Sequence, residues 1–276
     1  MTRQRRDSRH DAREAARPAS NHSIRRPAAT FRFYEELNDF LAPELRKRSF
    51  EHEFDGTPSV KDRVEALGVP HTEVDLILVD GCPVGFDHRL RGGERVAVYP
   101  VFESFEIGDV TWLRPRPLRE PRFVLDVHLG RLAAYLRLLG FDSVYRNHAD
   151  DETIIALALA GRRIVLTRDI GLLKDGRVTH GAFIHATRPL DQMREVVDRF
   201  QLEARLAPFS RCMKCNGTLT TVAGADLAPG EIPDDVRVRF RNLKRCGDCG
   251  RVFWPGSHFD RMRRRLATVG IRLPGA

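Results

Sequence analysis

Apolar and polar positions alternate most regularly between residues 122 and 205, where short apolar runs are followed by helical patterns. An apolar run at 123–125, closed by Asp126, leads into a segment whose leucines and alanines recur at helical spacing and which ends at Gly140. The same pattern predicts strands at 143–146, 163–167 and 182–186 and helices at 152–160, around 172–173 and at 189–203. Strands that alternate with helices are joined by crossover connections, so this segment predicts a parallel α/β sheet.

Residues 29–108 predict a domain of a different kind. Strands at 31–34 and 50–54 precede a helix at 59–67, and strands at 74–79 and 95–99 follow it. Ser59, with Asp62 three positions later, is typical of a helix start, because the hydroxyl caps the helix and the acid suits its dipole. Two strands, a helix and further strands predict a β-grasp fold. The predicted fold class is therefore α/β throughout.

Four of the five cysteines form two CxxC pairs, Cys212 with Cys215 and Cys246 with Cys249. Two such pairs place four thiolates around Zn²⁺, so residues 206–276 are predicted to form a zinc ribbon with a basic C-terminal segment. The 30 residues between the pairs exceed the usual spacing of roughly 15–20, which indicates an insertion. Paired cysteines of this kind favour a reducing, cytoplasmic compartment.

Charge is distributed unevenly along the chain. Residues 1–28 hold 8 Arg and 3 acids and are interpreted as a disordered basic tail. The formal net charge is −8 over residues 29–109 and +9 over residues 236–276, and a Pro/Arg-rich linker is predicted at 109–121. The basic end suits RNA, and the acidic module is expected to dock on that basic surface. No apolar run is long enough to cross a membrane.

Three acids lie where the predicted central strands end or the next helices begin: Asp126, Asp151 and Asp169. The carboxyl ends of parallel strands meet at one edge, so these side chains can converge there. Clustered carboxylates need a cation, and hard oxygen ligands suit Mg²⁺ or Mn²⁺. This is the layout of a metal-dependent phosphodiesterase. Each acid alone can also be explained as a helix cap, and Asp150 or Glu152 could serve as a fourth carboxylate or belong to a solvated turn.

Two arginines lie close to these acids in the sequence. Arg131 and Arg168 are candidates for holding the scissile phosphate, and the alternative for both is ordinary ion pairing. The C-terminal half also contains a possible histidine contact to RNA at His258, for which a hydrogen-bonded structural role is the competing interpretation.

Several motifs in order resemble those of the Mut7-C domain, a branch of the PIN-like nucleases. They are Asp126, the segments 129–133 and 136–142, Asp151, and the segment 163–169. The resemblance implies a PIN-like ribonuclease domain at 122–205, with Asp126, Asp151 and Asp169 on the family's acidic positions. The segment 252–262 also resembles the family's C-terminal motif.

Residues 29–105 resemble the ubiquitin-like sulfur carriers, most visibly at 79–81 and 93–100. Such carriers act through a free C-terminal Gly-Gly, whereas this chain continues into another domain. Sulfur transfer is therefore excluded, and the domain is expected to be an interaction or regulatory module with a protein partner.

The sequence predicts a ribonuclease in which Asp126, Asp151 and Asp169 hold catalytic Mg²⁺ or Mn²⁺ while the cysteines hold structural Zn²⁺ and the ribbon aids RNA binding. The competing hypothesis is a non-catalytic RNA- or ribosome-binding adaptor in which the acids are only helix caps. Cleavage that one Asp→Asn change abolishes would separate the two hypotheses.

Overall fold

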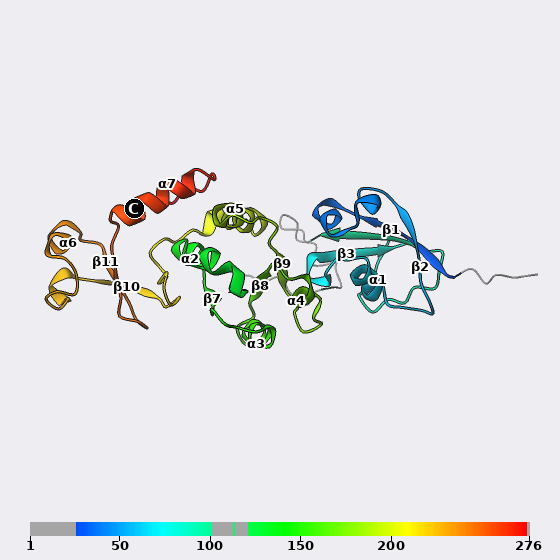
Figure 1. Ribbon diagram of the computed structural model, residues 1–276, viewed down its shortest axis with the longest axis horizontal. Coiled ribbons are helices and arrows are strands. Elements are labelled where there is room, and N and C mark those ends of the chain that lie inside the picture. The colour runs from blue at the N-terminus through cyan, green and yellow to red at the C-terminus, as the bar shows by residue number, and fades with distance from the viewer. Residues whose placement is uncertain (1–25, 101–112, 114–120, 275–276) are drawn as a thin grey trace, which may run out of the picture.

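The computed structural model describes residues 26–100, 113 and 121–274. Three sheets organise these residues (Figure 1). We call residues 26–100 the N-terminal domain, residues 121–205 the central domain and residues 206–256 the cysteine module. Figure 1 shows the central domain between the other two. No helix in the described ranges is long and apolar enough to cross a membrane.

The N-terminal domain has the predicted β-grasp fold. Its strands are β1 (Ala28–Phe33), β2 (Phe50–Glu53), β3 (Val74–Val79), β4 (Cys82–Pro83) and β5 (Arg95–Pro100), in the order β2-β1-β5-β3-β4. The central pair, β1 and β5, is parallel, and the other pairs are antiparallel. Helix α1 (Val60–Ala66) packs Val60 and Val64 into the core, and three short 3₁₀ helices complete the domain: η1 (Glu35–Phe40), η2 (Pro43–Leu45) and η3 (His71–Glu73). The predicted helix start is confirmed, since Ser59 and Asp62 form a reciprocal capping box.

The central domain has the predicted parallel sheet. Strands β6 (Phe123–Leu125), β7 (Ser143–Tyr145), β8 (Ile164–Thr167) and β9 (Gly181–Phe183) pair in the order β7-β6-β8-β9, all parallel. The helical elements are η4 (Val127–Leu129), α2 (Gly130–Leu138), α3 (Asp151–Gly161), α4 (Ile170–Lys174), α5 (Pro189–Arg199) and η5 (Leu202–Arg205). Separate apolar cores lie on the two faces, one with α2 and α5 and the other with α3 and α4. Both faces are covered, which explains why the strands are largely apolar.

The cysteine module contains a three-stranded antiparallel sheet of β10 (Leu219–Val222), β11 (Leu243–Cys246) and β12 (Val252–Phe253). The insertion expected between the cysteine pairs carries η6 (Gly224–Asp226) and α6 (Asp234–Arg239). It has a small apolar core of its own, made by Leu227, Ile232, Val236 and Leu243. The sequence indicated the insertion but not these two helices, because its apolar residues are too few and too scattered to show a period.

Helix α7 (Ser257–Ala267) follows the cysteine module and returns to the central domain. Its residues Phe259 and Leu266, with Ile271 beyond it, are buried in the same core as α2 and α5. The predicted segment 206–276 therefore shares a core with the domain predicted at 122–205. The predicted boundary at residue 28 falls inside β1, and most of the predicted tail (residues 1–25) and linker (109–112 and 114–120) lies outside the described residues.

The N-terminal domain contacts the central domain through η3. The Glu73 side chain, 0% exposed, accepts a hydrogen bond from Phe183 N at 2.6 Å and pairs with Arg199 at the end of α5. His71 Nε2 lies 3.0 Å from Val178 O, and Lys174 Nζ donates to Glu65 O at 2.6 Å.

The N-terminal domain, which is acidic, was expected to dock on the basic C-terminal segment. Its contacts instead lie on α4, β9 and α5 of the central domain. Figure 1 shows the cysteine module at the other end of the central domain. The contact between the two domains is made by specific buried pairs, such as Glu73 with Arg199, rather than by the net charges of the domains.

Candidate functional site

Asp126 and Asp169 lie at the carboxyl ends of the neighbouring strands β6 and β8 and are linked through Thr167. Thr167 Oγ1 donates to Asp126 Oδ2 at 2.8 Å and accepts from Asp169 N at 2.9 Å. Asp126 is 7% exposed, and its Oδ1 accepts from Val127 N at 2.5 Å. Asp169 Oδ1 accepts from Gly171 N at 2.6 Å. Both residues are N-caps, as expected if these acids serve as helix caps.

Asp151 does not cap α3. The N-cap is Asp150, whose Oδ1 accepts from Thr153 N at 2.9 Å. Glu152, the other neighbouring acid, pairs with Arg177. The sequence could not distinguish these three adjacent acids, since any of them can begin a helix. Within the described part of the chain, the Asp151 carboxylate accepts no hydrogen bond, and the capping explanation does not account for it.

Electrostatics connects Asp151 with the other two acids. Burial, and then the carboxylates of Asp169 and Asp126, raise the pKa of Asp151 above its ordinary value. Among the described residues, only the four cysteines form a group of three or more candidate ligands whose donor atoms all lie within 4.8 Å of one another. The three carboxylates are therefore within electrostatic range but spaced more widely than the sulfur atoms.

The two candidate phosphate-binding arginines have different surroundings. Arg168 Nη1 donates to the backbone oxygens of Ile184, His185 and Ala186, the first two at 3.0 and 2.9 Å. It therefore holds the segment after β9 in place. Arg131, in the first turn of α2, is exposed, and no protein partner of its guanidinium lies in the described ranges. Of the two, only Arg131 has all its donors available to a phosphate.

The predicted zinc ligands converge as expected. Cys212 and Cys246 are buried and Cys215 and Cys249 are exposed, with Sγ···Sγ separations of 3.7 Å for 212–249 and 3.4 Å for 215–246. Four sulfurs about 2.3 Å from one Zn²⁺ have separations of this size, so the donor set fits the metal. The backbone N–H of Arg251 contributes most to lowering the pKa of Cys249 to about 7, whereas burial raises the pKa of Cys215 to about 12 and also raises that of Cys212, so a bound cation would be needed to keep all four as thiolates.

Comparison with known protein families agrees with this arrangement. Residues 121–266 match the Mut7-C RNAse domain. The chain belongs to the Mut7-C RNase family. Residues 26–106 match the Mut7-C ubiquitin domain, so the predicted Mut7-C RNase domain and the predicted ubiquitin-like domain are both confirmed. The searches of curated proteins and of solved structures gave no match. The RNase match covers the three aspartates, the four cysteines and nearly all of α7 as one unit, which agrees with the shared core.

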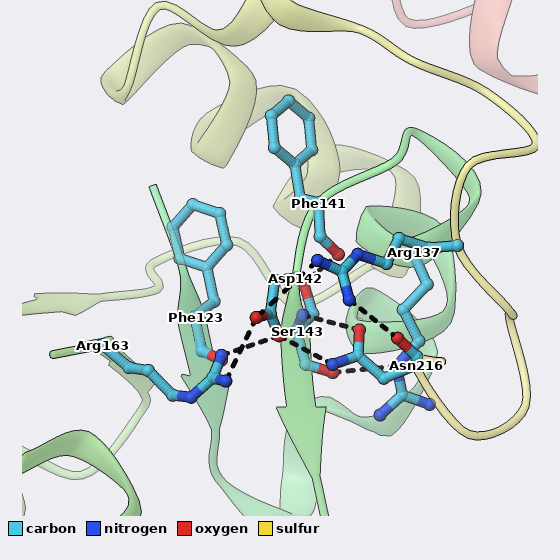
Figure 2. A network of polar contacts seen from close by, with 8 residues as sticks. Phe123, Arg137, Phe141, Asp142, Ser143, Arg163 and Asn216 are labelled. Atoms are coloured by element: carbon cyan, nitrogen blue, oxygen red, sulfur yellow. Dashed lines mark hydrogen bonds and ion pairs between the residues drawn. The ribbon is translucent and has the colours of Figure 1, made fainter. Parts of the chain in front are cut away.

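A buried polar network attaches the first cysteine pair to the Mut7-C RNase core (Figure 2). Asp142 accepts from Arg163 Nη1 at 2.7 Å and from Asn216 Nδ2 at 2.7 Å, and Asn216 Oδ1 accepts from Ser143 N at 2.9 Å. Arg163 and Asn216 lower the pKa of Asp142 against the opposing effect of burial, which is the larger single cause. The cysteine loop is thus fixed to the start of β7.

Arg137 belongs to the same junction and was missed by the sequence reasoning. It is 6% exposed, its Nε donates to Ser143 O at 2.8 Å, and its Nη1 donates to Met213 O at 3.3 Å and Lys214 O at 3.1 Å. A sequence signal was present, because Arg137 interrupts the apolar run from 136 to 139. A charged residue inside such a run has to find buried partners.

Proposed function

We propose that this chain is a ribonuclease that cleaves RNA phosphodiester bonds with Mg²⁺ or Mn²⁺ held by Asp126, Asp151 and Asp169. The match to the Mut7-C RNAse domain supports the reaction class. The observation that carries the assignment of the site is that Thr167 joins Asp126 and Asp169 at the carboxyl ends of β6 and β8, while Asp151 does not cap α3 and lies within electrostatic range of both. A carboxylate kept among like charges without a structural hydrogen bond is typical of a functional site.

The donor set suits a hydrated divalent cation. Mg²⁺ commonly retains several waters and binds through few carboxylates together with substrate phosphates, so it does not need the close spacing seen for the cysteines. Burial, and after it the negative charge of Asp169 and Asp126, raises the pKa of Asp151, and a bound cation would compensate that charge. When bound, the cation supplies an activated water and neutralises charge on the phosphate.

The residues of the chain have distinct proposed roles. Thr167 and Val127 fix both oxygens of Asp126, so this ligand is oriented before substrate arrives. Gly171 N fixes one oxygen of Asp169 and leaves the other available. Arg131 is exposed at the start of α2 and can pair with the phosphate. The cysteine module, with bound Zn²⁺, contributes a basic surface for RNA.

A matched pair of variants tests the proposal. Asp151→Asn removes the proposed ligand, whereas Asp150→Asn removes one adjacent charge and keeps a good N-cap residue. We expect Asp151→Asn to abolish Mg²⁺- or Mn²⁺-dependent cleavage of RNA oligonucleotides and Asp150→Asn to retain it. Both proteins should unfold at the same denaturant concentration as the parent, because neither change removes an apolar contact.

The adaptor hypothesis draws on the capping bonds of Asp126 and Asp169. It predicts equal behaviour of the two variants, with RNA binding but no cleavage in either, and that result would replace the ribonuclease proposal.

A further inference from the structure

A polar cavity lies between the start of α2, the end of β7 and the first cysteine pair. Its volume is about 340 Å³, and it is lined by Gly130, Ala134, Arg137, Tyr145, Asn147, Met213 and Lys214. These residues come from two parts of the chain about 70 positions apart, which the network around Arg137 and Asn216 holds together. No acidic side chain is among them. The cavity therefore suits an anion.

Two cationic residues, Arg137 and Lys214, line this cavity. Arg137 is buried at its wall, with its Nε and Nη1 bonded to backbone oxygens and not to a carboxylate. Lys214 and Asn147 are exposed at its rim. Arg137 donates to the backbone oxygen of Lys214, so the Lys214 ammonium itself is not engaged in this contact. A fixed buried charge with a mobile exposed one is a suitable pair for binding a phosphate.

The cavity adjoins the catalytic edge. Tyr145 Oη donates to Val127 O at 2.9 Å, and Val127 directly follows Asp126. A Cβ atom at Gly130 would lie 2.7 Å from Tyr145 Oη, so only glycine allows this close approach of α2 to β7. A strand of RNA with one phosphate at the carboxylates can therefore extend along this wall toward the cysteine pair.

We propose that this cavity is a second phosphate subsite, in which Lys214 and Asn147 bind a backbone phosphate of the RNA strand near the scissile linkage. That the bound polymer is RNA rests on the proposed function. That the cavity binds a phosphate does not depend on it. Arg137 supplies a fixed positive charge below the phosphate and acts as a positioning residue, because its bonded nitrogens also anchor the cysteine loop. The subsite would set which side of the cleavage point is held most tightly.

Binding by the full-length Asp169→Asn protein, which leaves RNA uncut under the proposed mechanism, tests the subsite. We expect Lys214→Ala in this background to weaken binding of a fluorescent single-stranded RNA several-fold at low salt. The slope of log K against log salt should fall by about 0.7, the value for one lost phosphate contact on a single strand. The matched control is Lys47→Ala, an exposed lysine on the N-terminal domain, which should leave both quantities unchanged.

Neutral linkages locate the contact. A single methylphosphonate at the contacted position should weaken binding to the parent protein and leave Lys214→Ala with no further loss, because the two changes remove the same interaction. Zinc content equal to that of the parent shows that the cysteine loop is intact.

If Lys214→Ala binds RNA as the parent does at every salt concentration, the subsite is refuted while the ribonuclease proposal stands. If Lys214→Ala weakens RNA binding equally at every position of the neutral linkage, Lys214 contacts no particular phosphate and the subsite is likewise refuted. Absence of RNA binding in the Asp169→Asn parent would remove both proposals.

Discussion

The Glu73 contact provides the most direct test of how the two Mut7-C domains are joined. Glu73 is 0% exposed, belongs to η3 of the N-terminal domain, and bonds Phe183 N and Arg199 in the central domain. Arg199 is itself only 13% exposed at its side chain. Glu73→Ala would remove the carboxylate that accepts from the Phe183 N–H and pairs with the Arg199 guanidinium.

The expected cost is large for a single substitution. Breaking a buried ion pair by removing one partner costs about 3–5 kcal/mol, because the remaining charge loses its compensation. This range includes the loss at the Phe183 N–H, since an orphaned buried donor alone typically costs roughly 1–3 kcal/mol. Glu73→Gln keeps an acceptor for Phe183 N and loses only the charge, so it should cost less than Glu73→Ala.

Urea unfolding followed by circular dichroism, together with hydrogen exchange at the Phe183 amide, measures the effect. We expect Glu73→Ala to lower the unfolding free energy by about 3–5 kcal/mol and to expose the Phe183 amide to exchange. The control Glu36→Ala, an exposed acid of the same domain, should change stability by no more than about 0.5 kcal/mol. Loss of less than about 1 kcal/mol with the amide still protected would show that the buried pair does not hold the domains together.

Four further predictions concern the zinc centre, the polar network around Asn216, the turn at Gly140 and the cap of α1. Cys212→Ser should abolish stoichiometric zinc in elemental analysis and unfold the cysteine module, since zinc binding contributes on the order of 10 kcal/mol to such sites; a full zinc equivalent in the variant would contradict this. Asn216→Ala should destabilise the protein by roughly 1–3 kcal/mol in urea by orphaning the buried Ser143 N–H; unchanged unfolding would refute the role of the network. Gly140→Ala should cost at least about 2 kcal/mol, since φ is +99° and the new Cβ would lie 2.3 Å from Ala207 O; a neutral thermal shift would be inconsistent with this packing. Ser59→Ala should cost about 0.5–2 kcal/mol through loss of the capping box, measured by the same thermal shift.

The sequence alone determined the elements and the chemistry that depend on local pattern. The alternation after residue 122 indicated a parallel sheet, because apolar runs and helical periods are set by neighbouring residues. Ser59 and Asp62 identified the start of α1 for the same reason. The two CxxC pairs indicated four sulfur ligands, since each pair is a short-range motif whose geometry the intervening residues fix.

The tertiary structure decided which of several equivalent residues does what. Three adjacent acids lie at the start of α3, and the backbone conformation selected Asp150 as the cap and left Asp151 within electrostatic range of Asp169 and Asp126. Arg168 was predicted to hold a phosphate, and only the structure shows that its Nη1 also bonds to the segment after β9.

Partners distant in the sequence decided the rest. Glu73 accepts a hydrogen bond from Phe183, which lies 110 positions later in the sequence. Arg137 donates to Lys214, which lies 77 positions later. Such pairs leave no local period, because their energy comes from burial and hydrogen bonding that exist only once the domains have packed. The sequence therefore determined which groups the protein carries, and packing determined which of them remain available for chemistry.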